Sequence, residues 1–316
     1  MKDLVRLLLL CTFVICANQL AHAQGCSDAG VCTAGPIGEL PLLGDSSTAY
    51  APRHFARLTY SYAVGEQRTT ITQVVPEFSF GITHRLAVQV KLPYISASGN
   101  LGSNSGVGDP TVTTSYAFVK TDNQRLDGII GAKFPSGDAN AKANGRSLPM
   151  PYQTSLGTTD LLLGINYRWK RWSGALAYQH VLDQGNANGF LRSVWDDTEK
   201  AQGYFEAYQL ERANDAVGRI QYAFKFKKLS VQPGLLAIVH LGEDVQGNSA
   251  EPPQRVTING SSGLTLNLTV DARYALNRHW SVELAYGSPL VVREVRPDGL
   301  TRSLVANLGI AYRFGE

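Results

Sequence analysis

The chain has 316 residues, of which 44% are hydrophobic and 17% are charged, and its formal net charge is +3. With 29 basic and 26 acidic side chains and no block of Lys or Arg, it gives no indication of a nucleic-acid partner. Past the N-terminal segment, no apolar run approaches the length of a spanning helix. Two classes remain: a soluble β-sandwich or barrel, and a barrel that crosses a membrane with strands.

Residues 1–23 have the features of a secretory signal peptide. Two basic residues precede the apolar run 7–15, and the small residues of "AHA" (21–23) surround a cleavage point. We therefore expect an exported mature chain that begins at Gln24. With the strand pattern below, this predicts a location in the bacterial outer membrane.

Removal of the signal peptide leaves two cysteines, Cys26 and Cys32. A single pair in an exported chain is expected to form a disulfide, here a small loop within the Gly/Pro-rich segment 24–53. We expect this segment to be periplasmic or plug-like. The spacing is not C-x-x-C and no His is near, so neither a metal nor a redox site is indicated. A lipoprotein with Cys26 as the lipidated residue is the other interpretation.

Twelve later segments alternate apolar and polar residues, as β-strands do when their two faces meet different surroundings. The clearest is 263–276, "GLTLNLTVDARYAL", which is long for a soluble domain, where about five or six residues are usual. The segments are 54–64, 69–82, 84–95, 110–120, 125–134, 158–169, 172–182, 215–226, 229–241, 263–276, 279–288 and 300–314.

The connections between these segments alternate in length. Those after the even-numbered strands are short: "TH", "TDNQ", "KR", "KK" and "NRH". Those after the odd-numbered strands are long, except for the first, "GEQR": 96–109, 135–157, 183–214, 242–262 and 289–299. This sorting is typical of outer-membrane barrels, with periplasmic turns and termini and long surface loops. It predicts an all-β, up-and-down antiparallel transmembrane β-barrel of about 12 strands over residues 54–316.

Aromatic residues cluster beside the tight turns on the apolar parity, as expected of side chains at a lipid–water interface. A thinner second set lies near the long loops. The first set is Phe118, Trp169, Trp172, Phe224, Phe226, Tyr274, Trp280, Tyr312 and Phe314, and the second is Tyr94, Phe134 and Tyr286. The closing strand ends in Tyr-x-Phe, which resembles the signal read by barrel-assembly machinery, although Gly315 and Glu316 follow it.

Extending the parity around the barrel predicts which charged residues face the lumen. Basic residues outnumber acids on this face, which favours a pathway for small anions, carboxylates or phenolates, while a set of rigidifying ion pairs is the alternative. The predicted lumen-facing binding residues are Arg57, Glu77, Arg85, Lys91, Asp127, Lys133, Asp160, Arg168, Arg219, Asp271, Arg273 and Glu283, with Lys225 and Arg313 on the same parity.

A barrel of 12 strands lies between the filled interior of eight and the open channel of sixteen to eighteen. We therefore expect a narrow pore for small solutes, constricted by a loop or by residues 24–53. The alternative is a plugged structural, secretion or assembly barrel without transport. The longest loop, 183–214, is predicted to fold inward as a constriction, to present a surface for a ligand, or to pack on neighbouring loops through its aromatic residues.

Four stretches resemble the outer-membrane transporter-like family named for the meta-pathway of phenol degradation. They are "FGITHRLAVQVKLPYI" (80–95), "GVGDPTVTTSYAF" (106–118), "GAKFPSGDAN" (131–140) and "GTTDLLLGINYRW" (157–169). The resemblance implies an outer-membrane barrel that takes up or exports small, often aromatic or hydrophobic compounds.

Catalytic motifs are not evident. A Ser/His pair would need His180 or His240, and no flanking motif supports either; by parity His180 faces lipid and His240 faces the lumen near a rim. We predict no enzyme activity, cofactor or metal. The expected partners are outer-membrane lipid, the barrel-assembly machinery and a small solute.

Overall fold

The computed structural model describes residues 54–250, 252–300 and 302–314. Most of these residues belong to one large antiparallel sheet. Its strands are β1 (Phe55–Val64), β2 (Thr70–Gly81), β3 (Leu86–Lys91), β4 (Tyr94–Gly99), β5 (Gly102–Val107), β6 (Thr111–Lys120), β7 (Gln124–Lys133), β10 (Thr158–Trp169), β11 (Trp172–Gln184), β12 (Asp215–Tyr222), β13 (Phe224–Lys225), β14 (Leu229–His240), β17 (Gly263–Ala275), β18 (Trp280–Val291) and β19 (Leu304–Arg313).

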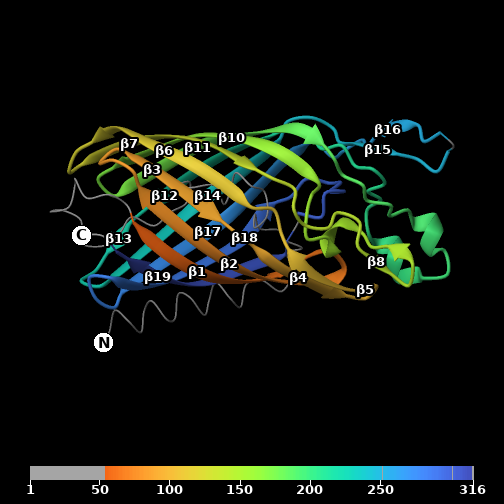
Figure 1. Ribbon diagram of the computed structural model, residues 1–316, viewed down its shortest axis with the longest axis horizontal. Helices are drawn as coiled ribbons and strands as arrows, with labels where there is room; N and C mark the ends of the chain where they lie inside the picture. The colour runs from red at the N-terminus through yellow and green to blue at the C-terminus, as the bar shows by residue number, and fades with distance from the viewer. Residues whose placement is uncertain (1–53, 251, 301, 315–316) are drawn as a thin grey trace.

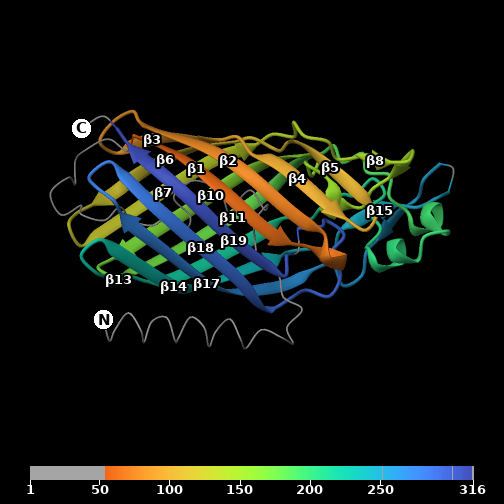
Figure 2. The same ribbon diagram turned by 90° about the horizontal axis from the view of Figure 1, so that it is seen from below.

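The sheet closes on itself because β1 pairs with both β2 and β19. When β3 with β4 and β12 with β13 are each counted as one interrupted strand, the described chain forms a closed barrel of 12 antiparallel strands. Its strands tilt across the long axis of an elongated molecule (Figure 1, Figure 2). The predicted all-β, up-and-down barrel is confirmed.

One predicted boundary is wrong in an informative way. The segment expected at 84–95 is interrupted at Leu92 and Pro93, where proline has no N–H for the ladder. The chain then continues as β4, which pairs with β2 and turns into β5. The expected loop 96–109 therefore contains a hairpin, which extends the wall beyond the barrel. Its Ser, Gly and Asn residues carry no apolar alternation, so the pattern did not reveal it.

The outer face of the barrel is apolar, as the strand parity predicted. On β17, Asn267, Thr269, Asp271 and Arg273 are buried while Tyr274 on the other face is exposed. Leu176, Leu284 and Leu308 point outward and are 70%, 54% and 52% exposed. A continuous surface of this kind is unfavourable in water and suits acyl chains.

Aromatic rings mark the tight-turn end of this surface. The predicted set at that end is exposed except for Phe314, which is half-buried, and neighbouring rings touch in three groups. The groups are Tyr116 with Phe118, Trp172 with Tyr222 and Phe224, and Trp280 with Tyr312 and Phe314. Toward the long loops, Tyr94 and Phe134 are exposed and Tyr286 is half-buried.

The long connections gather at the opposite end from the tight turns (Figure 1). They contain the short hairpins β8 (Lys142–Ala143) with β9 (Arg146–Ser147) and β15 (Val245–Gly247) with β16 (Arg255–Thr257). They also hold the 3₁₀ turns η2 (Met150–Tyr152), η3 (Arg192–Trp195) and η4 (Glu199–Gly203), while η1 (Glu66–Arg68) forms the short β1–β2 connection. No helix among the described residues is both long and apolar enough to cross a membrane.

Candidate functional site

Five charged side chains form a chain of ion pairs across the inner face of β3, β2, β1, β18 and β17. Arg57 Nη1 lies 3.0 Å from Glu77 Oε1, and Lys91 Nζ lies 3.4 Å from Glu77 Oε2. On the other side, Arg57 Nε lies 3.1 Å from Glu283 Oε2, and Glu283 also pairs with Arg273. We call Lys91, Glu77, Arg57, Glu283 and Arg273 the ion-pair belt.

Small residues on β19 allow the belt to pass over that strand. Arg57 lies beside Ala311, and Glu283 lies beside Gly309. A side chain at position 309 would begin only 3.3 Å from Thr59 Oγ1 and 3.6 Å from the Cβ of Glu283. Because Ala311 has only a methyl group and Gly309 has no side chain, the Arg57 guanidinium can reach β18 across β19.

Cations exceed acids in this part of the lumen. Next to the belt, Asp271 pairs with Arg219 and accepts a 2.5 Å hydrogen bond from Gln221 Nε2. Together the belt and this pair contain four basic and three acidic groups, which gives an excess of one positive charge. In a confined, partly desolvated passage, such an excess attracts anions.

A second ionic group lies on β7 and β10. Lys133 Nζ is 2.9 Å from Asp160 Oδ2 and 3.4 Å from Asp109 Oδ2. Gln179 Nε2 donates to Asp160 Oδ2 at 2.6 Å. The register connects this group to the belt. Lys91 on β3 lies beside Thr111 on β6, Thr111 lies beside Lys133 on β7, and Lys133 lies beside Asp160 on β10. The second group therefore continues the row of the belt along the wall.

The remaining predicted lumen residues lie toward the tight-turn end. Asp127 is buried and pairs with Arg125, 2.7 Å from Nε to Oδ2. Arg168 is half-buried at the end of β10, and Arg85 is exposed in the β2–β3 turn, where its carbonyl accepts from the Ala117 N–H. Lys225 is exposed and Arg313 is half-buried. Cys26 and Cys32 lie outside the described residues, and a binding role for any of the predicted residues stays a prediction.

The lumen also has an apolar wall that the sequence analysis did not identify. Six buried side chains from β7, β10, β11, β12 and β14 form one cluster: Ile129, Leu162, Ala175, Ala177, Val217 and Leu236. Register partners Ile129–Gly164, Gly164–Ala177 and Ala177–Val217 place this cluster across neighbouring strands. The signal was present, because these residues fall on the lumen parity and are apolar, but charged residues alone were considered.

The longest loop, 183–214, packs against neighbouring loops. Phe190, Trp195 and Tyr204 are buried together with Leu148 and Tyr152 of the loop 134–157. The Tyr204 hydroxyl lies 2.9 Å from that of Tyr152 and 3.0 Å from Thr69 Oγ1. The interpretation that this loop packs on neighbouring loops through its aromatic residues is confirmed.

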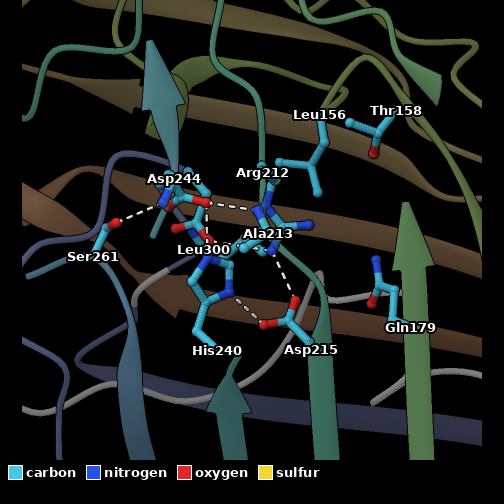
Figure 3. Close-up of polar contacts among 12 residues, drawn as sticks. Leu156, Thr158, Gln179, Arg212, Ala213, Asp215, His240, Asp244, Ser261 and Leu300 are labelled. Carbon is cyan, nitrogen blue, oxygen red and sulfur yellow. Dashed lines mark hydrogen bonds and ion pairs between the residues drawn. The ribbon is translucent and has the colours of Figure 1, made fainter. Parts of the chain in front are cut away.

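A cluster of six ionisable side chains joins these loops to the barrel mouth (Figure 3). Arg212 Nη2 lies 2.9 Å from Asp215 Oδ2 and 3.2 Å from Asp298 Oδ2. His240, at the end of β14, lies between Asp215 and Asp244: Nδ1 is 2.6 Å from the first and Nε2 is 2.7 Å from the second (Figure 3). Arg293 pairs with Asp298, and its Nη1 lies 3.6 Å from Asp244 Oδ2. We call these residues the mouth cluster.

The charges of the mouth cluster balance. A histidine with both ring nitrogens facing carboxylate oxygens must donate from both, so His240 is the imidazolium and the cluster has three cations and three anions. Burial alone would raise the pKa of Asp298, but Arg293 and Arg212 outweigh it and hold that pKa below its usual range. Burial opposes the charge of Arg212, yet Asp215 and Asp298 raise its pKa. Its ion pairs hold the connections that contain Arg212, Asp244 and Asp298 against the ends of β12 and β14.

A cavity remains between the barrel wall and these loops. Its volume is about 80 Å³, and its lining includes Lys91 and Lys133 from the wall and Gln153, Asp298 and Arg302 from the loops. The two lysines belong to the ionic groups described above, so the cavity lies where those groups meet the loops.

The mouth cluster is not arranged for hydrolysis. Both His240 nitrogens are engaged by carboxylates, so neither is free to accept a proton from a nucleophile. The Ser261 hydroxyl instead accepts from the Asp244 backbone N–H and donates to the Ile258 carbonyl. His180, the other histidine that a Ser/His pair could use, contacts an amide: its Nδ1 lies 3.1 Å from Asn214 Oδ1. Within the described residues, no group of three or more His, Cys, Asp or Glu side chains could hold a metal ion.

Solved structures similar to this chain include channels and porins. The COG4313 outer membrane channel from Pseudomonas putida F1 is 17% identical, with a TM-score of 0.58 over 87% of this chain and 100% of that chain. The NanC porin is 9% identical, with a TM-score of 0.46 over 83% of this chain and 100% of that chain. The CymD monoaromatic hydrocarbon channel is 10% identical, with a TM-score of 0.42 over 94% of this chain and 95% of that chain.

These likenesses concern the fold. No family model matches the chain, and no curated protein matches it either. The outer-membrane-channel fold that the sequence resemblance implied is confirmed by the first of the similar structures. The link to phenol degradation stays a prediction.

Proposed function

We propose that this chain is a channel of the bacterial outer membrane for small solutes, and that its lumen favours anions and aromatic molecules. The observation that carries the proposal is a closed barrel with an apolar outer face and an inner face lined by the ion-pair belt. The N-terminal segment 1–23, with its signal-peptide pattern, supports export.

Two features of the lumen support the choice of solute. The belt and the Arg219–Asp271 pair together carry an excess of one positive charge, which favours small anions over cations. The buried apolar cluster that includes Leu162, Val217 and Leu236 makes this part of the inner face apolar, which suits an aromatic ring or a short hydrocarbon better than a hydrated ion. A molecule with both properties, such as an aromatic carboxylate or phenolate, fits this two-sided lumen.

The covered mouth supports a second candidate, a plugged structural or assembly-associated barrel. The buried loop cluster around Tyr152 and Tyr204 and the mouth cluster around His240 hold long connections over the lumen. In a channel, these loops act as a constriction; in a plugged barrel, they act as a permanent cover.

Single-channel recording in planar bilayers separates the two candidates. We expect the folded mature protein to give steady openings in potassium chloride, and larger currents when chloride is the permeant ion. A folded preparation that never conducts supports the plugged barrel and contradicts the channel.

A further inference from the structure

Polar side chains on β17 are buried in the lumen without partners. Asn267 is 0% exposed, and neither its amide nitrogen nor its amide oxygen has a hydrogen-bond partner within the described part of the chain. Thr269, two positions along the same face, is 6% exposed and its Oγ1 is also unpaired there. Buried polar groups are normally hydrogen-bonded, so two neighbours that are not require an explanation.

These groups point into the lumen. They share the inner face of β17 with Asp271 and Arg273, whose side chains form the ion pairs described above. Residues two apart on a strand lie about 7 Å from one another on one face. Asn267 and Thr269 can therefore contact a single small molecule together.

Open space lies beside them. Thr269 is flanked in register by Gly234 on β14 and Gly287 on β18. A Cβ added at Gly287 would meet no heavy atom within 4 Å, whereas one added at Gly234 would collide with the Ile220 carbonyl. The free space is therefore on the β18 side of Thr269.

Apolar surfaces border this polar pair on both sides. Asn267 is the register partner of Leu236, which belongs to the apolar wall described above. Gly287 is the register partner of Val305, which packs with Ala63 and Ile71 in a second buried apolar cluster. The amide and hydroxyl thus lie between two apolar patches.

We infer that Asn267, Thr269 and the space at Gly287 form a binding subsite for a neutral solute that has an apolar ring and a group with both a hydrogen-bond donor and an acceptor. The nearest charged groups on this face, Asp271 and Arg273, are each already paired, so the subsite itself is neutral. A primary carboxamide pairs with both atoms of the Asn267 amide, and a hydroxyl group pairs with one of them and with Thr269. The inference rests on the proposed channel function and adds neutral aromatic solutes, held by hydrogen bonds at this subsite, to the anions that the ion-pair belt favours.

Benzamide is the probe that tests the subsite, since it combines an apolar ring with a carboxamide. Equilibrium dialysis of labelled benzamide against the folded mature protein in detergent, with detergent alone as the blank, measures its affinity. We expect one saturable site, and at least ten-fold weaker binding of toluene and of benzoate. Equal binding of all three would overturn the inference.

Three variants locate the site. Asn267→Leu and Gly287→Leu should each weaken benzamide binding at least ten-fold, and Thr269→Val, which keeps the side-chain volume, should weaken it several-fold. Gly218→Leu is the matched control, because Gly218 faces outward and an added Cβ would meet only Leu176 Cδ2, at 3.7 Å. If either leucine variant fails to fold, the Thr269→Val result decides.

Thermal unfolding distinguishes a binding role of Asn267 from a structural one. If Asn267 only stabilised the fold, its replacement would lower the unfolding temperature. Removing an unpaired buried amide relieves its desolvation cost, so Asn267→Leu should unfold at the same or a higher temperature than the wild type. A lower unfolding temperature with unchanged benzamide affinity contradicts the inference. Binding in detergent does not depend on conduction, so failure of the subsite and failure of the channel are distinguishable.

Discussion

Arg57 on β1 reaches across β19 to Glu283 on β18, with 3.1 Å between Nε and Oε2. The same guanidinium pairs with Glu77 on β2, so Arg57 joins the two acids of the ion-pair belt. Its position at the closure of the barrel, where β1 meets β19, ties the first strand to the last three. The belt is continuous only through this side chain.

Replacing Arg57 with glutamine should destabilise the barrel. The change leaves Glu77 and Glu283 as nearly buried carboxylates that have lost a shared cation, which we expect to cost about 3 kcal/mol. Urea unfolding followed by tryptophan fluorescence measures the effect. Arg255→Gln, which breaks an exposed pair with Glu211, is the control and should change stability by less than about 1 kcal/mol. Equal losses in the two variants would show that the belt has no special role.

Reversing the charge of Lys91 should shift ion selectivity. Lys91→Glu places a second carboxylate beside Glu77 and converts the local excess of positive charge into an excess of negative charge. The zero-current potential in a potassium chloride gradient should move toward the value expected of a cation-selective pore. Lys142→Glu, on the exposed β8–β9 hairpin, is the control. A potential that responds equally to both substitutions argues against a selectivity role for the belt.

Arg212→Met should loosen the loops over the mouth. Arg212 connects Asp215, at the start of β12, to Asp298 in the connection between β18 and β19, and its loss removes that link and leaves both carboxylates buried. Limited digestion with proteinase K should cleave the loop 183–214 several times faster in the variant. Lys142→Met, at an exposed lysine of the β8–β9 hairpin, should leave the cleavage rate unchanged. Unaltered digestion of the Arg212 variant would mean that apolar packing alone holds the loops.

Stability should depend on pH through Glu66. Burial raises the pKa of the Glu66 carboxyl from 4.5 to about 7; Arg296, 3.4 Å away, and Arg302 oppose the shift, and Asp298 adds to it. Between these two values the unfolded chain has lost the proton and the folded chain keeps it. Stability contributed by Glu66 is therefore complete below pH 4.5 and is lost as pH rises to about 7, by about 3 kcal/mol.

Unfolding temperatures across this pH range check the assignment. The wild type should become less stable as pH rises through the window, and Glu66→Gln should remove this component of the pH dependence. Glu211→Gln, at an exposed carboxyl, should retain the slope of the wild type. If Glu66→Gln keeps the full slope, another group is responsible.

Local alternation was sufficient to predict the barrel. The burial of Asp271 and Arg273 against the exposure of Tyr274 follows directly from the two-residue period of β17. The same rule placed Glu77, Lys133 and Asp160 on the inner face, where the structure finds them in ion pairs. Parity assigns a face but gives no register, so it could not show that Lys133 lies beside Asp160.

The mouth cluster could not be predicted from the sequence. Arg212, Asp244 and Asp298 lie in long connections without periodicity, and Arg212 and Asp298 are 86 residues apart in the chain. Their proximity depends on closure of the barrel, which brings strand ends from distant parts of the chain together. The β4–β5 hairpin was missed for a different reason, because its Ser and Gly residues form a backbone ladder without an apolar alternation.

We propose that this barrel encloses a conducting lumen in which the ion-pair belt and the Arg219–Asp271 pair together carry an excess of one positive charge. The most direct test is the zero-current potential of the wild-type mature protein in a planar bilayer under a potassium chloride gradient. We expect repeated openings whose zero-current potential has the sign for chloride selectivity. A potential with the sign for potassium, or no openings from demonstrably folded protein, would contradict it.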